Sequence, residues 1–169
     1  FVDGSAMTGD VDTSSGNVDP NDACNTNDWR TMLVGTLGAG GKGYFVLDVT
    51  NPTTATIPGG APAFTAANAS QLVKLDRTRS IEAGTAPNCT VTGISALEQV
   101  ACNKAVEEDR DIGHITARPV QAENDPMRTT QITRMNNNRW AAVMGNGYNS
   151  TNQRPVLLVQ YLDGAKELL

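Results

Sequence analysis

Residues Gly38 to Gly43 read GAGGKG, and they match the G-x-G-x-x-G spacing of a dinucleotide-binding loop. Such a loop opens a helix that faces the pyrophosphate, and it needs an acidic residue roughly 20 positions later. Here the glycines lead directly into a strand-like run that ends at Thr50, and GGAPAFT stands where the acidic residue is required. A phosphate loop is also excluded, because Gly43 follows Lys42 where Ser or Thr is needed. We therefore expect no nucleotide site, and we interpret the glycines as positive-φ residues of a hairpin loop.

An acidic segment runs from Asp10 to Asp22 with the sequence DVDTSSGNVDPND. Its oxygen-bearing side chains alternate as Ca²⁺ ligands do, and Asp10, Asp12 and Asp19 are the candidate ligands. The glycine falls one place late, at Gly16, and no bidentate glutamate closes the loop. The pattern favours a polar loop over a metal site.

His114 is the one histidine of the chain and is a candidate general base. A base of this kind needs a partner nucleophile, and no Ser or Cys stands in a nucleophile-elbow sequence. The scattered carboxylates show no pairing either. We interpret His114 as a structural residue and predict that the chain is not an enzyme.

Three cysteines, Cys24, Cys89 and Cys102, lack the C-x-x-C spacing of zinc and redox motifs. Cys89 and Cys102 would close a short loop as a disulfide in an exported protein, which would leave Cys24 free or paired elsewhere. The low lysine content and the many Asn, Thr, Ser and Gly residues favour export. Buried, reduced thiols are the alternative.

The composition limits the possible partners. With 169 residues, 39% apolar and 18% charged, the chain is large enough for one globular domain. It carries 13 basic and 18 acidic residues and no Lys/Arg cluster, so we expect no nucleic-acid partner. No apolar run approaches the ~20 residues of a membrane helix. The sequence opens on Phe1 without a leader, and we expect an internal piece of a longer, processed protein.

Two pairs of apolar runs share one layout. Trp29–Gly35 and Gly43–Thr50 flank a glycine turn, and Arg139–Gly145 and Arg154–Leu162 repeat the pattern. In each pair the second run leads to an aspartate. An internal repeat of this size predicts sheets stacked around an axis, and the near-continuous apolar runs predict strands covered on both faces. Residues 1–28 before the first pair are expected to be mostly loop.

The region between the two copies differs in composition. Residues 53–70 are rich in Pro, Ala, Gly and Thr and are expected to be loop, whereas Ser95 and Glu98 form a capping box that opens a helix. Four apolar residues then fall on one face of this amphipathic helix: Leu97, Val100, Ala101 and Ala105. After the helix, DIGHITARPVQAEN is expected to form the first strand of the second copy.

The stretch DWRTMLVGTLGAGGKGYFVLDVTNP resembles the C-terminal propeller domain of the PilC/PilY family, large calcium-dependent proteins of type IV pilus tips. DIGHITARPVQAE is similar to a strand of the same domain through Arg118, Pro119 and Val120. NRWAAVMGNGYNSTNQRPVLLVQYLDGAKELL is similar to a third segment, in which Gly145 to Ser150 is the most specific run. These matches occur in the order of the family.

The resemblance implies an all-β fold, about two blades of a quinoprotein-like seven-bladed β-propeller with a short helical insertion. Residues 1–169 would form a partial propeller domain, with the first blade in 1–52, the insertion in 53–111 and the second blade in 112–169. Trp29 and Trp140 would pack the blades. The calcium of the full-length protein would bind downstream of this segment.

The function implied by the resemblance is non-enzymatic. It comprises pilus biogenesis, control of retraction, twitching motility and attachment to surfaces or host cells. The implied partners are pilin or minor pilin subunits, the rest of the propeller and a surface receptor. The protein would be exported across the outer membrane and would be extracellular and pilus-associated.

Two alternatives remain. VQYLDGAKELL resembles the tryptophan-docking motif of quinoprotein dehydrogenases, but the tryptophan is absent and no vicinal cysteine pair is present. A carbohydrate-binding propeller would differ from the pilus protein only in its ligand.

Overall fold

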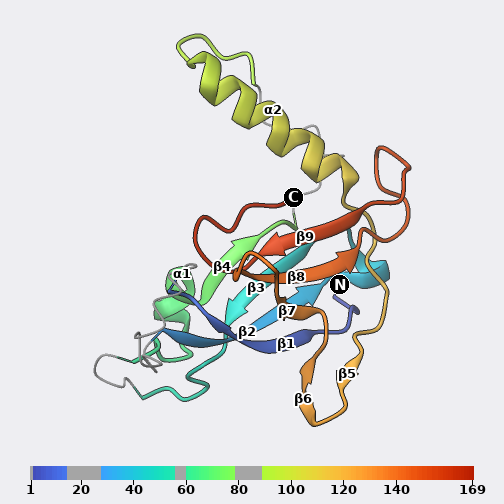
Figure 1. The fold of residues 1–169 in the computed structure, drawn as a ribbon. Helices are drawn as coiled ribbons and strands as arrows, with labels where there is room; N and C mark the ends of the chain where they lie inside the picture. The colour runs from blue at the N-terminus through green and yellow to red at the C-terminus, as the bar shows by residue number, and fades with distance from the viewer. Residues whose placement is uncertain (1, 15–27, 56–59, 79–88) are drawn as a thin grey trace.

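The computed structural model describes residues 2–14, 28–55, 60–78 and 89–169. Most of its regular structure is β-strand, arranged in antiparallel sheets with one long helix projecting from them (Figure 1). A four-stranded sheet has the order β1-β2-β3-β4, formed by Met7–Asp12, Trp29–Thr36, Tyr44–Asp48 and Val73–Asp76. A three-stranded sheet has the order β7-β8-β9, formed by Ile132–Arg134, Trp140–Gly145 and Leu157–Tyr161. A small hairpin pairs β5 (Gln121–Ala122) with β6 (Asp125–Thr129).

Both predicted hairpins are present. β2 pairs with β3 across the first glycine loop, and β8 pairs with β9 across the second. The β-branched and aromatic residues of these runs favour extended backbone, and the glycines and asparagines between them permit the turns. The two hairpins hold the centre of each sheet.

The core lies between the two sheets, which pack face to face. Alternate residues of β2 and β3 point into it, and Met32, Val34, Tyr44 and Val46 are all buried. Ile132, Ala142, Met144 and Leu158 contribute from the second sheet. The phenol oxygen of Tyr44 also donates a 2.7 Å hydrogen bond to Gln160 Oε1 across the core, and burial raises the pKa of Tyr44.

The outer face of the first sheet departs from the expectation that both strand faces are covered. Leu33, Phe45 and Leu47 point away from the core and are only half buried, because no described sheet lies on that side. α1 (Ala69–Leu72) flanks the same face. Leu47, Phe64, Leu72 and Val73 line a groove of about 340 Å³ between this helix and the sheet.

Several expected boundaries are corrected. Residues 7–12, expected to be loop, form β1, in which Met7, Gly9 and Val11 are buried while Asp10 is exposed. β4 lies inside the region 53–111 and completes the first sheet, so that region is not only an insertion. Residues 115–120 form no strand, and β7 is the strand that pairs with β8. Pro119 donates no backbone hydrogen bond, which disfavours a ladder there.

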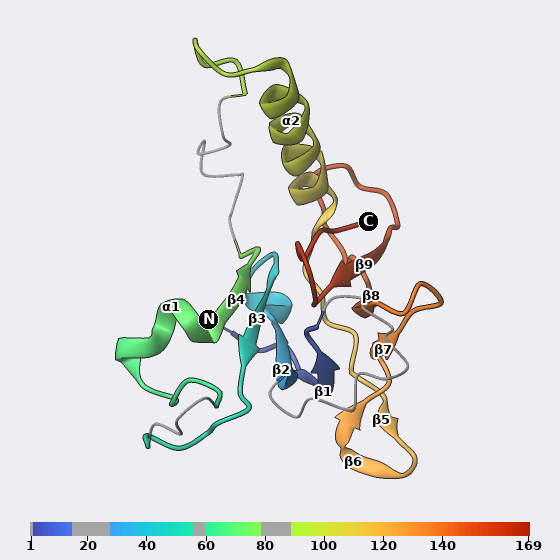
Figure 2. The ribbon, with the colours of Figure 1, turned by 60° about the vertical axis from the view of Figure 1, so that its left-hand side comes forward.

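The predicted helix is confirmed as α2, which spans Ala96–Asp111. Its capping box is complete: the Ser95 hydroxyl accepts from the Glu98 amide, and the Glu98 carboxylate accepts from the Ser95 amide. Its apolar residues do not face a core, since Leu97 is 84% exposed and Val100 is 67% exposed. Figure 2 shows the reason, because the first turns of α2 project beyond both sheets.

The other end of α2 is anchored to the body of the protein. Arg77, one residue beyond β4, forms ion pairs with Glu108 at 3.0 Å and Asp109 at 3.2 Å. Lys104 Nζ donates to the carbonyl oxygen of Leu168. The helix is therefore held at one end and extended into solvent at the other.

A disulfide joins Cys89 to Cys102, with their Cα atoms 5.6 Å apart. It ties the loop before α2 to the middle of the helix, and the Gln99 side chain adds a hydrogen bond to the carbonyl oxygen of Cys89. The cysteine pairing expected from the sequence is present, whereas Cys24 lies outside the described residues.

Replacing both Cys89 and Cys102 by serine should loosen the projecting turns without unfolding the sheets. We expect amide hydrogen exchange in residues 96–101 to accelerate about tenfold or more, because local opening no longer has to work against the crosslink. Exchange mass spectrometry of peptides from α2 and from β8 measures this. Equal acceleration in β8 would contradict the local role.

Trp29 and Trp140 begin β2 and β8, and their rings meet edge to face with centroids 5.7 Å apart. This places the two tryptophans in one contact between the sheets. Trp29 is nevertheless 36% exposed, less buried than a central packing residue, because it stands at the end of its strand.

Changing Trp29 to alanine should lower the free energy of unfolding by about 2 kcal/mol, the sum of a partial burial term and an aromatic pair. Urea denaturation measures the loss. Met127 on β6, which is also large and apolar but 80% exposed, supplies the control as Met127→Ala. A Trp29 variant as stable as the control would show that the pair contributes nothing.

Candidate functional site at the glycine-loop junction

Three segments meet at one end of the two sheets: the loop Gly38–Gly43, the segment Asp111–Ile115 and the loop Gly145–Pro155. We call them the glycine-loop junction. The middle segment bonds to both loops, since the Gly43 amide donates to Gly113 O at 3.3 Å and the His114 amide donates to Tyr148 O at 2.8 Å. The Tyr148 amide returns a bond to His114 O at 3.2 Å. The two most distinctive motifs of the sequence therefore converge on one backbone assembly.

The glycines are required by backbone conformation and by close approach. Gly38, Gly43 and Gly147 have φ values of 62°, 112° and 76°, so the positive-φ role expected for the first loop holds at Gly38 and Gly43, whereas Gly41 is extended with a φ of −177°. A Cβ on Gly147 would overlap the carbonyl group of His114, and one on Gly113 would overlap that of Tyr148. The first loop thus uses its glycines to form a turn at the junction.

Asn146 is the polar centre of the junction. Its side chain is buried; Nδ2 donates to Asp111 O at 2.6 Å and to Arg154 O at 2.9 Å, and Oδ1 accepts from the Val156 amide at 3.0 Å. One side chain therefore satisfies three backbone groups, from the end of α2 and from the far side of the loop.

The end of α2 is tied to the second loop by charge. Arg154 donates to both carboxylate oxygens of Asp111, at 2.8 and 2.6 Å, and Asn152 Nδ2 donates to Asp111 Oδ1 at 2.9 Å. Arg110 Nε donates to Asn152 Oδ1 at 3.2 Å. The hydrogen bond from Arg154 holds the pKa of Asp111 below its ordinary value. The ion pair between these two side chains therefore links the end of α2 to the second loop.

The lowered pKa of Asp111 makes the stability of the fold depend on pH. A carboxyl whose pKa is lower in the folded state stabilises that state above its ordinary pKa, and the contribution disappears as pH falls through the lowered value. We expect Arg154→Ala to melt at a lower temperature than the wild type at pH 7, with the difference narrowing steadily below about pH 4. Thermal melts at several pH values test this. A difference independent of pH would mean that Arg154 acts through packing alone.

His114 lies beside the first loop. Its Nδ1 is 3.1 Å from Gly38 O, and its ring stacks on Tyr148 with centroids 5.0 Å apart. The histidine therefore joins the two loops, as its structural interpretation requires.

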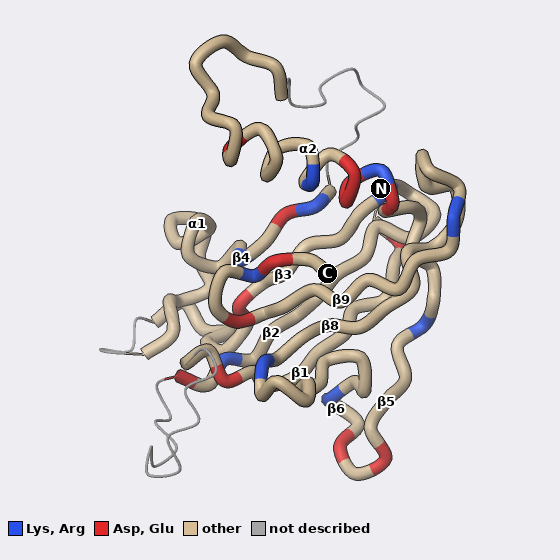
Figure 3. The backbone as a smooth tube through the Cα atoms, turned by 45° about the horizontal axis from the view of Figure 1, so that its top comes forward, with Lys and Arg blue, Asp and Glu red and all other residues tan. Residues whose placement is uncertain are grey.

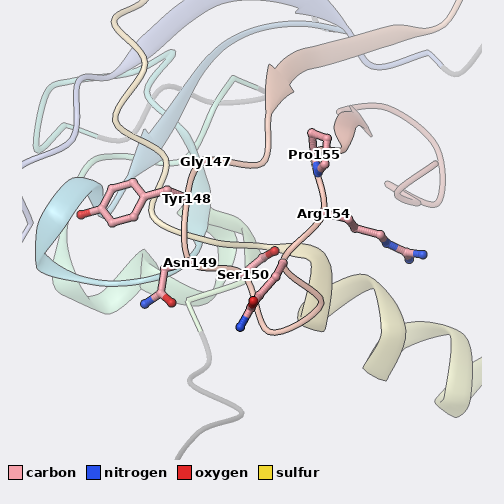
Figure 4. A pocket seen from close by; sticks show the side chains of 7 residues that line it. Gly147, Tyr148, Asn149, Ser150, Arg154 and Pro155 are labelled. Atoms are coloured by element: carbon pink, nitrogen blue, oxygen red, sulfur yellow. The ribbon is translucent and has the colours of Figure 1, made fainter.

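A polar cavity of about 510 Å³ lies at the second loop, lined by Gly147–Ser150 and Gln153–Pro155. In Figure 4, Tyr148 and Arg154 point to opposite sides of this loop, with Ser150 between them. The side chains diverge, so they offer a polar contact surface and no convergent set of reacting groups.

The candidate calcium ligands on β1 lie apart from the glycine-loop junction. Asp10 and Asp12 lie on β1, where Asp10 Oδ1 accepts from the Thr31 hydroxyl at 2.7 Å and Asp12 Oδ1 accepts from Ser14. Asp19 lies outside the described residues. Within the described ranges, no group of three or more His, Cys, Asp or Glu residues is arranged to hold a metal ion.

Charged residues of both signs are dispersed along the described parts of the chain. Figure 3 shows Lys and Arg interleaved with Asp and Glu along the chain, including both signs near the anchored end of α2. None of the helices in the described parts of the chain is both long and apolar enough to cross a membrane.

Sequence reasoning singled out the G-N-G-Y-N-S run but missed what Asn146, Asp111 and Arg154 do. Asn between two glycines signalled a special turn. Nothing in the sequence indicated that its amide reaches the end of a helix 35 residues earlier.

The fold and the junction define a mostly β protein in which two face-to-face sheets are joined by a hydrogen-bonded, polar loop assembly. A type IV pilus biogenesis factor PilY1 homolog from Xylella fastidiosa is 30% identical over 138 residues, which cover 82% of this chain and 6% of that protein. The PilY1 factor of Pseudomonas aeruginosa PAO1 is 27% identical over 131 residues, covering 78% of this chain and 7% of the factor. The chain is homologous to a segment of the PilY1 pilus biogenesis factors, which confirms the family resemblance.

A shorter region matches more closely. Over 54 residues, 31% of this chain, the identity with a PilY1 homolog of Xylella fastidiosa is 46%. No family model matches the chain, and no solved structure matches it. The chain spans less than a tenth of the length of the curated relatives described above.

Proposed function

We propose that this chain is a structural segment of a type IV pilus biogenesis factor that works at the cell surface. The observation that carries the proposal is the alignment of about four-fifths of the chain with proteins named for that role. The parent protein would support pilus assembly, retraction control, twitching motility and attachment to a surface or host cell. Its partners would be pilin or minor pilin subunits and a receptor.

The proposed architecture is about two blades of a seven-bladed β-propeller. Neighbouring blades of a propeller pack face to face, and the two sheets here pack in this way around Val34, Val46 and Leu158. The half-buried outer face of the first sheet, with Leu33, Phe45 and Leu47, would receive a further blade. The groove beside α1 lies on that face and would be filled by the same neighbour.

The proposed contact surface is the projecting part of α2. Leu97 and Val100 expose apolar side chains there, and Val91 in the adjoining loop is exposed as well. Exposed apolar residues grouped on one projection are typical of a surface that meets a partner. The Cys89–Cys102 disulfide would keep this projection ordered outside the cell.

The proposed role is non-catalytic. The carboxylate of Asp111 and the ring of His114 are both occupied in joining backbone segments of the junction. The calcium implied by the family resemblance would bind downstream of Leu169 in the parent protein.

The test is genetic. In the source organism, the gene for the parent protein is deleted and restored either whole or without these 169 residues. Sheared surface pili are then measured by pilin immunoblot. We expect the whole gene to restore pili and the shortened gene to fail, with the shortened protein still secreted. Normal pili with the shortened gene would contradict the proposal.

A further inference from the structure

A polar cavity of about 420 Å³ lies where the β5–β6 hairpin meets β1, which are side by side in Figure 1. Three segments that are distant in the sequence line it: Ser5, Ala6 and Thr8; Arg118, Pro119 and Gln121; Pro126 and Thr129. The cavity shares no residue with the glycine-loop junction. It is therefore a second polar site on the described part of the chain.

Two threonines hold the strands beneath the cavity together. The Thr8 amide donates to Thr129 Oγ1 at 3.2 Å, and the Thr129 hydroxyl donates to Thr8 O at 3.3 Å. The Thr8 hydroxyl donates to Met127 O at 2.5 Å. Thr129 is only 7% exposed, so this network lies below the open rim. The hairpin is thus fixed to β1 before any ligand binds.

The segment that carries Arg118 is also held in place. The Thr130 amide donates to Val120 O at 2.9 Å, and the Val120 amide donates to Gln131 Oε1 at 3.2 Å. Pro119 restricts the backbone dihedral φ between Arg118 and Val120. The backbone that presents Arg118 to the cavity is therefore ordered.

Three side chains at the rim have donors to spare. Arg118, Ser5 and Gln121 are exposed, and their side chains form no hydrogen bond or ion pair within the described residues. Each of them carries at least one N–H or O–H donor. No Asp or Glu lines the cavity, and the nearby Asp125 accepts from the Met127 amide at 2.9 Å. The cavity thus combines one positive charge with two neutral donors.

This arrangement fits a carboxylate better than other anions. The planar guanidinium of arginine pairs with both oxygens of a carboxylate. One positive charge balances one carboxylate, whereas a phosphate group carries nearly two negative charges and favours several cations or a helix N-terminus. Neither of these lines the cavity. Ala6, Pro119 and Pro126 add apolar surface beside the donors, which suits the methylene groups of an acidic side chain.

We propose that this cavity binds an acidic side chain of a partner protein, with Arg118 as the anchor. Gln121 and Ser5 donate further hydrogen bonds to the same carboxylate or to the peptide carbonyl beside it. A peptide is favoured over an acidic sugar because no aromatic ring lines the cavity on which a sugar could stack. The proposal rests on the free donors and their charge, and it does not depend on the pilus role.

Arginine modification of the full-length protein tests the site. Phenylglyoxal reacts with exposed guanidinium groups, and peptide mass spectrometry follows Arg118 and the exposed Arg134 of β7. We expect about 10 mM N-acetylglutamate α-amide to slow the modification of Arg118 at least about threefold and to leave Arg134 unchanged. The uncharged N-acetylglutamine amide, at the same ionic strength, should slow neither. Gln121→Ala should reduce the protection of Arg118 about twofold.

Several results would overturn the proposal. An unchanged Arg118 rate would do so, as would equal protection of Arg118 and Arg134, which indicates general screening of exposed cations. Equal or stronger protection by the glutamine compound, by inorganic phosphate or by glucuronate would also contradict it. Full protection in Gln121→Ala would show that the ligand binds outside this cavity. Loss of pili in the genetic test bears only on the pilus role, so the two proposals fail by separate results.

Discussion

Replacing Asn146 by alanine should lower the free energy of unfolding by about 3 to 5 kcal/mol, the largest effect that we expect from a single side chain here. The change leaves Asp111 O, Arg154 O and the Val156 amide without their partner inside a buried junction. A buried group without a hydrogen bond costs about 1 to 3 kcal/mol, and three groups lose theirs together.

The measurement is urea denaturation of the wild type and the variant side by side. Asn146→Asp is the sharper probe, because it keeps the size of the side chain but replaces the amide nitrogen with a carboxylate oxygen. That oxygen can only accept, so it would face the carbonyl oxygens of Asp111 and Arg154 without a hydrogen bond. Asn136→Ala, at an exposed turn position, serves as the control and should change stability by less than about 0.5 kcal/mol. Asn146 variants as stable as this control would show that the junction is not held by its amide.

Arg139→Ala should cost about 3 kcal/mol, because it strips the cation from a buried carboxylate. Arg139 Nε donates to Asp163 Oδ1 at 2.8 Å, and Asp163 is only 1% exposed. The guanidinium also lies 3.8 Å from the Tyr161 ring centroid and binds Glu167, whose pKa it lowers. The bond from the Trp140 amide to Asp163 Oδ2 remains, which places the estimate at the lower end of the range for broken buried pairs.

Arg139→Lys separates charge from geometry. Lysine keeps the positive charge but lacks the planar fork that reaches Asp163 and Glu167 together, so we expect an intermediate loss. Arg134→Ala, an exposed arginine on β7, is the matched control. Thermal melts of Arg139→Ala, Arg139→Lys and Arg134→Ala measure the expected order of stability, with Arg139→Ala the least stable and Arg134→Ala the most stable. A lysine variant as unstable as the alanine variant would indicate that the fork matters and the charge does not.

The hairpins could be predicted from sequence because their signal is local. Runs such as Tyr44–Leu47 carry β-branched and aromatic residues next to glycine turns, and both features act within a few positions. The sequence signal for α2 was equally local, because the capping box of Ser95 and Glu98 specifies its first turn. β1 escaped prediction because its outer face carries polar residues and its buried face includes Gly9, a composition typical of loops.

The site depended on contacts that are distant in sequence. Asn146 reaches the end of α2 within the glycine-loop junction, and Trp29 reaches Trp140 because the two sheets face each other. The periodicity of Leu97 and Val100 predicted an amphipathic helix, but periodicity alone cannot show whether another surface covers its apolar face. The helix projects instead, and its exposed face became the proposed contact surface.

The most direct test of the account is an experimental structure of the full-length protein that includes these residues. The account predicts that the sheets β1–β4 and β7–β9 are neighbouring blades around one axis. It also predicts that a third sheet covers Leu33, Phe45 and Leu47. A structure in which the two sheets form a closed two-layer sandwich, with that outer face in solvent, would contradict it.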